Sequence, residues 1–312
     1  MANITASDVK ELREMTGCGM MDCKRALVEA DGNRDEAVKI LREKGLAKAA
    51  KKAGRIAAEG IVKAKVNGTN GVIVEINCET DFCAKSDKFL ELVETITDTI
   101  LTNDAADVEA LKNCTIAGGA QTVSEYMTEK IATIGENMNI RRFAKVSEEN
   151  GIVVSYIHAG GKIGVLVDVE TDVVNDAIKE MAKNVAMQAA ALKPQYTTRA
   201  EVDADYISRE KEILLAQIMN DPKESQKPQK VIDGMINGRI NKELKEICLM
   251  DQTYVKAEDG KQTVSAYVAQ VAKENNAKVA VKNFVRFETG EGMEKKNEDF
   301  AAEVAAQMAA AK

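Results

Sequence analysis

The side chains best suited to chemistry in this sequence are two pairs of cysteines and one histidine. Cys18 and Cys23 have four residues between them, and so do Cys78 and Cys83. Four thiolates could bind zinc, and gaps of about two to four residues between ligands are typical of such sites. The spacing permits a metal site but indicates it only weakly, and we favour buried thiols. Because His158 is the only histidine, a Cys–His or Ser–His site depends on it alone, and a zinc site with two histidines is excluded.

Length and composition narrow the classes of function. The chain has 312 residues, enough for two or three domains with a buried core. Its net charge of −7 speaks against nucleic acid as a direct ligand, because such a ligand needs a basic face. The sequence has no phosphate-binding glycine loop and no Gly-x-Gly-x-x-Gly motif. We therefore expect no cofactor, no metal and no catalytic residue.

The sequence also lacks the patterns of membrane and export segments. No apolar stretch approaches the length that spans a membrane, and residues 1–30 carry charges where a signal peptide needs an apolar core. We expect a cytoplasmic protein without membrane contact, in which the six cysteines are reduced thiols.

The elements of the chain are arranged around the stretch INCETDFCAKSDKFL, at 76–90. Before it, β-branched runs from Gly60 to Asn77, divided by an Asn-Gly-Thr-Asn-Gly sequence, predict a β-hairpin. After it, apolar residues at spacings of three and four over 89–101 predict a helix. The segment Thr80, Asp81, Phe82 and Cys83 therefore lies where a strand ends and a helix begins. Thr80 or Asp81 can cap that helix.

Phe82 lies outside the strand alternation and ahead of the helical stripe, so nothing local requires its burial. A large apolar ring beside the Asp81 carboxylate on a rigid turn makes a good wedge for a partner protein. The simpler alternative is a helix cap followed by a core phenylalanine, and this stretch alone favours that alternative.

Residues 151–172 repeat the hairpin pattern at a constant offset of 91. The sequence Gly-Ile-Val at 60–62 recurs at 151–153, and Glu-Thr-Asp at 79–81 recurs at 170–172. We therefore predict that a hairpin-then-helix unit occurs twice. Where the first copy has Phe82 and Cys83, the second has Val173 and Val174, so the unit does not need the phenylalanine to fold. This comparison favours a functional role for Phe82.

Residues 4–45 predict a compact module of three helices. Asn33 can cap the third helix, and Gly45 is expected to close it. Met20 and Met21, before the second helix, are either core filler or an adaptable contact surface. The Ala/Lys-rich residues 46–59 predict a solvated linker that could be helical.

The rest of the chain alternates strand and helix segments around an insertion. Residues 102–123 are typical of a surface excursion. Residues 200–250 follow helical spacing on both sides of a proline-containing break and predict a projecting helical hairpin with coiled-coil-like stripes. The alternating strand 278–288 must complete a sheet opened before this hairpin, so the hairpin is an insertion. The Ala-rich tail 294–312 predicts a short helix that needs a surface to dock on.

Several blocks of the sequence resemble the bacterial elongation factor Ts family, in the family's order. They are ITASDVKELREMTGCGMMDCKRAL (4–27), KAAKKAG (48–54), INCETDFCAKSDKF (76–89), GENMNIRR (135–142) and FAAEVAAQMA (300–309). The resemblance implies an α+β fold with an N-terminal ubiquitin-associated-like domain, a core of two similar subdomains, an inserted antiparallel coiled coil and a C-terminal helical module. The corresponding residues are 1–54 (three-helix domain and linker), 55–146 (first subdomain), 147–199 and 251–290 (second subdomain), 200–250 (coiled coil) and 291–312 (C-terminal module).

The resemblance also implies a partner protein and a mechanism. Members of the family are guanine-nucleotide exchange factors of elongation factor Tu, and their TDFV segment enters its nucleotide domain and dislodges a magnesium ion. Here that segment is Thr80, Asp81, Phe82 and Cys83. Cysteine replaces the usual valine, and we expect little loss from this small apolar side chain.

Supporting contacts with elongation factor Tu are implied for residues outside this segment. They are Lys10, Arg13, Met20, Met21 and His158. Gln188 stands where the family has a further histidine. The coiled coil is used in dimerisation in the family, so a homodimer through 200–250 is a further expectation.

Two other classes of function compete with exchange. A ribosome- or chaperone-associated adaptor would use the three-helix module to bind a different helix or peptide. A thiol or metal enzyme would use Cys78 and Cys83. Exchange needs no catalytic acid, base or nucleophile, which suits a chain with one histidine, and it is the hypothesis that we favour.

Overall fold

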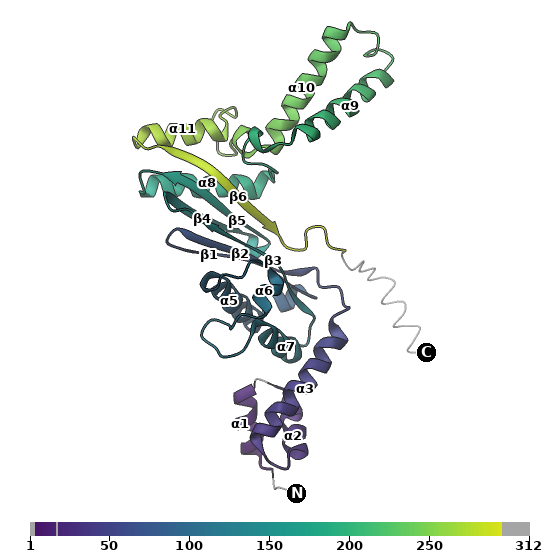
Figure 1. Cartoon of the computed structure of the whole chain (residues 1–312), viewed down its shortest axis with the longest axis vertical. Helices are drawn as coiled ribbons and strands as arrows, with labels where there is room; N and C mark the ends of the chain where they lie inside the picture. The colour runs from purple at the N-terminus through teal and green to yellow at the C-terminus, as the bar shows by residue number, and fades with distance from the viewer. Residues whose placement is uncertain (1–3, 17, 295–312) are drawn as a thin grey trace.

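The computed structural model describes residues 4–16 and 18–294 as an elongated molecule (Figure 1). A bundle of three helices lies at one end, two small sheets with their helices form the middle, and a projecting pair of helices lies at the other end. The fold is α+β, as predicted. Within the described ranges, no helix is long and apolar enough to cross a membrane. The predicted tail helix lies, apart from Glu294, outside the described residues.

The bundle consists of α1 (Ala6–Thr16), α2 (Met20–Glu29) and α3 (Arg34–Lys52). Its small core consists of Val9, Leu12, Cys23, Ala26, Leu27, Ala37 and Leu41. The Asn33 side chain accepts a hydrogen bond from the backbone N–H of Glu36 and so caps α3, as predicted.

The prediction that the third helix ends at Gly45 is wrong, because α3 continues to Lys52. Alanine and lysine are strong helix formers, so residues 46–52 extend the helix. At Gly45 the helix passes close to α7 (Val123–Ile134), and a Cβ atom there would lie 3.5 Å from that of Ala132. The first half of the predicted linker is therefore part of a helical arm that joins the bundle to the core (Figure 1).

The first sheet has the strand order β1–β2–β3 and is antiparallel throughout. β1 (Glu59–Asn67) and β2 (Asn70–Cys78) form the predicted hairpin, and β3 (Met138–Ser147) pairs with β2. Alternate residues of β2 face opposite sides, so Val72 and Val74 pack in the core with α5 (Asp87–Thr102) and α7, whereas Ile73 faces the second sheet. The predicted excursion between α5 and α7 carries the short helix α6 (Val108–Lys112).

The second sheet has the order β4–β5–β6 and is also antiparallel. It consists of β4 (Gly151–His158), β5 (Ile163–Thr171) and β6 (Val279–Glu288), with η1 (Ala159–Gly161) in the first turn. The helices α8 (Asp176–Leu192) and α11 (Val264–Glu274) complete this unit. The two sheets pack face to face around Val62, Ile73, Val153, Leu166 and Phe287, with the helices on the outer faces.

The two units repeat each other, but the predicted constant offset of 91 is wrong along the second strand of each hairpin. Gly60 pairs with Asn77 in the first hairpin, and Gly151 pairs with Glu170 in the second. The second strands therefore correspond at an offset of 93. The cause is the turn, which spans residues 68–69 in the first hairpin and the longer 159–162 in the second.

Two backbone details confirm the corrected register. A Cβ atom on Gly60 would lie 2.2 Å from the carbonyl oxygen of Ile76, and one on Gly151 would lie 2.0 Å from that of Val169. Both central strands have a bulge just before this residue, after Glu75 and after Asp168 respectively. The repeated Glu-Thr-Asp sequence is thus out of register by two residues, and Glu79 corresponds to Asp172.

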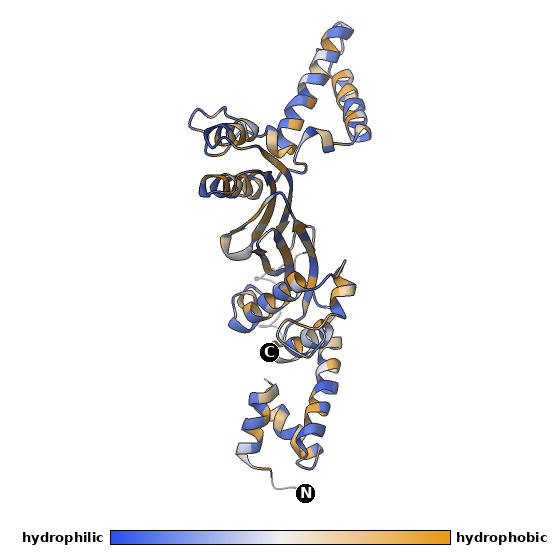
Figure 2. Ribbon diagram, turned by 60° about the vertical axis from the view of Figure 1, so that its left-hand side comes forward, coloured by the Kyte–Doolittle hydropathy of each residue, from blue (hydrophilic) through white to orange (hydrophobic). Residues whose placement is uncertain are grey.

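Each unit has an insertion between its two helices. In the first unit it is the loop with α6, and in the second it is the projecting pair α9 (Ala204–Asn220) and α10 (Gln229–Ile247), flanked by η2 (Arg199–Glu201) and η3 (Leu249–Asp251). This pair is the helical hairpin predicted within 200–250. It has its own apolar stripe, in which Ile218, Ile232, Ile236, Ile240 and Leu244 are buried, and it is amphipathic along its length (Figure 2).

Candidate functional site

The first corner of the core, residues 79–86, joins β2 to α5. It contains a separate short helix, α4 (Asp81–Ala84). The hydroxyl oxygen of Thr80 accepts a hydrogen bond of 3.1 Å from the backbone N–H of Cys83, so Thr80 caps a helix as predicted. That helix is α4 and not α5, however, because α5 begins after its own cap, Ser86.

Phe82 projects from this corner with its side chain in solvent. It is 83% exposed, whereas Cys83 and Ala84 of the same turn are buried in the core of the first unit. The corner therefore turns one side of α4 inward and presents the phenylalanine outward. The alternative of a core phenylalanine is excluded.

Glu136, in the loop before β3, fixes the backbone of the corner. One of its carboxylate oxygens accepts hydrogen bonds of 3.0 Å from the N–H groups of Glu79 and Thr80, and the other accepts one of 2.6 Å from the Thr80 hydroxyl. In return, the Glu79 carboxylate accepts a hydrogen bond of 2.6 Å from the N–H of Asn137. Two loops that are far apart in the sequence therefore hold each other through two carboxylates, and the turn that carries Phe82 is preorganised.

The roles of Glu136 and Glu79 as positioning residues were not predicted from the sequence. Glu136 lies in the block 135–142 that carries part of the resemblance, but a hydrogen bond to a backbone 56 residues away leaves no local pattern. A local signal did exist for Lys85, because it follows Asp81 at a spacing of four residues on a helical turn.

Asp81 is ionised at the exposed side of the corner. Lys85 Nζ donates a hydrogen bond of 2.6 Å to its carboxylate, and this bond holds the pKa of Asp81 below its usual value. The ammonium group of Lys162 lowers the pKa of Asp81 further. Because Lys162 lies in the turn between β4 and β5, the second unit also contributes to the electrostatics of the corner.

His158 lies at the same end of the two sheets as the first corner. It ends β4, it is exposed, and its Nδ1 lies 2.9 Å from the hydroxyl of Tyr156. Lys162, four residues further on, donates a hydrogen bond of 2.9 Å to Glu59, which pairs with Cys78 at the start of the corner. The structure thus brings His158 and the Thr80–Cys83 segment to one end of the core.

The other predicted contact residues lie on the bundle. Lys10, Arg13, Met20 and Met21 are all exposed on α1 and α2. In the described part of the chain, no hydrogen bond or ion pair joins any of the four to the first corner, and α1 and α2 lie at the far end of α3 from the sheets (Figure 1). The structure therefore does not bring them together with Phe82 in one site.

Gln188 has an internal role. Its side chain is fully buried in α8, where its amide nitrogen donates to the Gln252 side chain and to the carbonyl of Thr253. Its amide oxygen accepts a hydrogen bond of 2.8 Å from the N–H of Val255. Because both ends of the side chain bind its own subdomain, Gln188 does not offer a contact to a partner.

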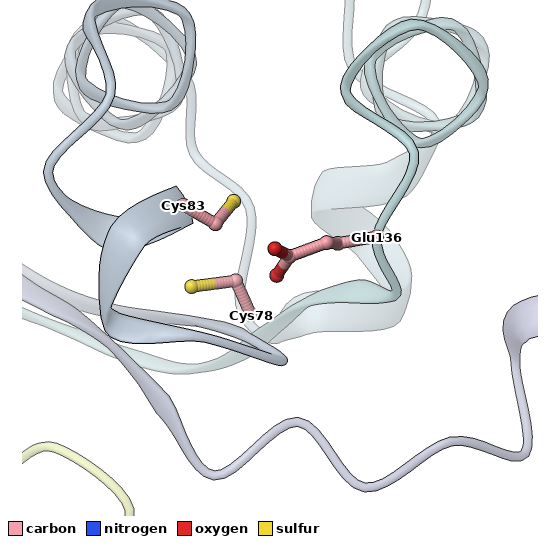
Figure 3. A group of neighbouring side chains, drawn as sticks. All are labelled: Cys78, Cys83 and Glu136. Atoms are coloured by element: carbon pink, nitrogen blue, oxygen red, sulfur yellow. The ribbon is translucent and has the colours of Figure 1, made fainter. Parts of the chain in front are cut away.

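The two cysteine pairs lie in different cores. Cys23 is buried in the bundle with Cys18 packed against its cluster, whereas Cys78 and Cys83 are buried in the first unit. The four thiols therefore do not form one zinc site. Cys78 and Cys83 instead lie beside Glu136 (Figure 3). A hydrogen bond with the Cys83 thiol and burial raise the pKa of Cys78.

Comparison with known proteins finds similarity over nearly the whole chain. A family model described as elongation factor TS matches residues 79–291. Elongation factor Ts of Clostridioides difficile (strain 630) is 51% identical over 310 residues, which cover 99% of this chain and 100% of that protein. Elongation factor Ts of Clostridium botulinum (strain Eklund 17B / Type B) is 48% identical over 307 residues, which cover 98% of this chain and 99% of that protein. Elongation factor Ts of Clostridium acetobutylicum is also 48% identical over 307 residues, with 98% of each chain covered.

Proposed function

Because this chain belongs to the elongation factor Ts family, whose members act in protein biosynthesis, we propose that it binds elongation factor Tu carrying GDP and promotes release of the GDP. In this proposal the segment Thr80, Asp81, Phe82 and Cys83 enters the nucleotide domain of the partner and dislodges its magnesium ion. GTP can then bind to the vacated site. The proposed place of action is the cytoplasm.

The observation that carries the proposal is the exposure of Phe82 on a turn that its own subdomain holds rigid. A ring that is 83% exposed contributes little to the core of this protein. Apolar anchors on rigid turns are typical hot spots of protein interfaces, because little conformational entropy is lost when they bind. The adjacent Asp81 carboxylate adds a charged contact.

Exchange follows from thermodynamic coupling between the two ligands of elongation factor Tu. A factor that binds the nucleotide-free form more tightly than the GDP form must weaken GDP binding by the same ratio. Magnesium bridges phosphate oxygens and protein ligands, so its displacement removes a large part of the affinity for GDP. A weakening of about ten-thousandfold requires roughly 5.5 kcal/mol of differential binding. An aromatic anchor supplies on the order of 2–4 kcal/mol, so further contacts must supply the rest.

We assign those further contacts to the bundle and to the second unit. Lys10, Arg13, Met20 and Met21 offer two cations and two flexible apolar side chains on the exposed face of α1 and α2. His158 offers a ring at the same end of the core as Phe82. In this assignment residues 1–54, which include the bundle, are a ubiquitin-associated-like domain, and the core comprises 55–199 and 251–290. The inserted pair of helices in 200–250 is a coiled coil that can mediate dimerisation.

The variant Phe82→Ala tests the proposal. We expect stimulated release of a fluorescent GDP analogue from elongation factor Tu, followed by stopped flow, to fall at least about tenfold, because tenfold corresponds to only about 1.4 kcal/mol of a hot-spot contribution. Far-UV circular dichroism and thermal unfolding of the variant should match the wild type, because the ring is exposed.

A matched control is Val174→Ala, which truncates an exposed apolar residue between β5 and α8 in the second unit. We expect wild-type release rates for this control. Wild-type rates in Phe82→Ala would contradict the insertion of this segment. Absence of any stimulation by the wild-type protein, together with its co-purification with ribosomes or a chaperone, would instead favour the adaptor hypothesis.

A further inference from the structure

We propose that Cys78, Cys83 and Glu136 form a binding site for a zinc ion at the base of the first corner. Their two sulfur atoms and a carboxylate oxygen lie within 4.8 Å of one another. The three side chains come from the end of β2, from α4 and from the loop before β3, and they gather at one point (Figure 3). Because zinc lies about 2.0–2.3 Å from thiolate and carboxylate ligands, small side-chain rotations would bring all three into its coordination shell.

The ligand types select the class of metal. Two thiolates with one carboxylate suit zinc and similar borderline-soft cations, whereas magnesium and calcium take oxygen ligands. The two cysteine side chains are buried, at 0% and 5% exposure, and Glu136 is only partly exposed. The site is thus shielded on the thiol side, and a water molecule could reach a fourth coordination position from the side of Glu136.

The Glu136 carboxylate is already oriented as a metal ligand would be. One oxygen accepts two backbone N–H groups, and the other accepts, among the residues that the structure describes, the Thr80 hydroxyl alone. A carboxylate offers about four acceptor positions, so the second oxygen keeps capacity for a metal bond. Carboxylates that bind metals are usually held by hydrogen bonds of this kind.

Binding would exchange protons for the ion. The Cys78 thiol donates a hydrogen bond to the carbonyl of Thr80, with the sulfur 3.2 Å from that oxygen, so it is protonated in the present state. Zinc binding would release one proton from each cysteine to solvent, and the affinity should therefore fall as the pH is lowered. The bound ion would join three segments under the turn that carries Phe82. The proposal goes beyond nucleotide exchange, because the ion binds whether or not that turn acts on elongation factor Tu.

Cobalt is a suitable probe, because thiolate-bound Co²⁺ absorbs in the near ultraviolet and tetrahedral Co²⁺ absorbs strongly in the visible range. The full-length protein would be metal-depleted, kept reduced with a phosphine and titrated with Co²⁺. We expect saturation at one equivalent, loss of the absorption on addition of Zn²⁺, and one zinc per chain by elemental analysis after desalting. A protein that retains no stoichiometric zinc and gives no thiolate–cobalt band would overturn the proposal.

Three variants locate the ion. Cys83→Val removes a ligand but keeps a small buried apolar side chain, and Glu136→Gln keeps a hydrogen-bond acceptor, so both should fold. We expect at least about tenfold weaker Zn²⁺ binding in each, by competition with a chromophoric chelator. Cys18→Ser is the control, because it alters the other pair with the same spacing. Loss of the cobalt band in Cys18→Ser, with an unchanged band in Cys83→Val, would overturn the assignment. Mass spectrometry that detects a Cys78–Cys83 disulfide in protein that binds no metal would also overturn it.

Discussion

The two units of the core share one carboxylate–backbone hydrogen bond, called the clamp below, and differ in the corner that this bond closes. At the first corner, the Glu79 carboxylate accepts the N–H of Asn137 at 2.6 Å. At the second corner, residues 172–175, the Asp172 carboxylate accepts the N–H of Lys278 at 2.7 Å. Each acid follows the central strand of its sheet, and each N–H precedes the third strand, so the two pairs are equivalent. This clamp closes both units and belongs to the fold.

The segment with Phe82 belongs to the first corner alone. Seven residues, 79–85, separate β2 from the cap of α5, whereas three, 172–174, separate β5 from the cap of α8. The additional residues form α4. Glu136 is replaced at the equivalent place by Ala277, which has no carboxylate. A unit of this kind therefore folds without α4 and without a carboxylate at the position of Glu136. This supports a role outside folding for Phe82, which α4 presents, and for the turn that Glu136 holds.

The bulges of the central strands give a second comparison. Glu75, at the first bulge, is fully buried and accepts hydrogen bonds from Arg141 at 2.9 Å and from Arg142 at 2.7 Å. Asp168, at the second bulge, faces the carboxyl group of Glu148, and one of its oxygens is buried without a partner among the described residues. Two arginines therefore form direct ion pairs with the buried carboxylate of the first unit, whereas the half-buried carboxylate of the second unit faces another carboxyl group and has Lys282 as a weaker compensating charge.

The largest effect on stability is expected for Glu75→Gln. Loss of this charge leaves two arginines without their buried partner and weakens the hydrogen bond of 2.7 Å from the N–H of Gly290, which ties the chain after β6 to the first sheet. Removing one partner of a buried ion pair costs several kcal/mol, and we expect a loss of about 3 kcal/mol in the free energy of unfolding because the arginines are partly solvated. Urea unfolding followed by circular dichroism measures it. A loss no greater than that of Asp168→Asn at neutral pH would contradict the comparison.

A smaller and separable effect is expected at the two helix caps of the corners. Asn175→Ala removes the cap of the long helix α8 and should lower the free energy of unfolding by about 1 kcal/mol without slowing nucleotide exchange. Thr80→Ala removes the cap of α4 and the hydrogen bond to Glu136, so it should slow exchange severalfold with a smaller loss of stability. Urea unfolding and stopped-flow GDP release on both variants test this. Equal effects of the two variants on exchange would remove the functional distinction between the corners.

Local patterns in the sequence predicted the elements of the fold well. The hairpin before 78, the capping of α3 by Asn33, the inserted helical pair and the alternating last strand are all present, whereas Thr80 caps α4 instead of the predicted longer helix. Each depends on periodicity or on a cap a few residues away. The stretch around Phe82 alone favoured a core phenylalanine, which its exposure excludes; only the comparison of the two units favoured a functional role.

Features that depend on distant partners were missed or wrong. The end of α3 was misjudged at Gly45 because the close approach of α7 cannot be read from the glycine itself. The offset of the repeat was wrong because a longer turn shifts every later pairing, and a chance recurrence of Glu-Thr-Asp concealed the shift. The roles of Glu79 and Glu136 depend on hydrogen bonds between loops that no local pattern joins.

The pH dependence of stability gives the finest test of the difference between the bulges. Burial and a hydrogen bond shared with Glu148 raise the pKa of Asp168 to about 6, although Lys282 acts in the opposite direction. A carboxyl group with a raised pKa binds its proton more tightly in the folded state, so its contribution favours folding at low pH and declines as the pH rises from about 4, the unfolded pKa, to about 6. Asp168→Asn removes this titration. We therefore expect the variant to gain stability relative to the wild type between about pH 5 and about pH 7, as measured by urea unfolding at both values. The difference between variant and wild type isolates this group from the other carboxylates, and a difference that does not change with pH would show that Asp168 is as well solvated as an exposed acid.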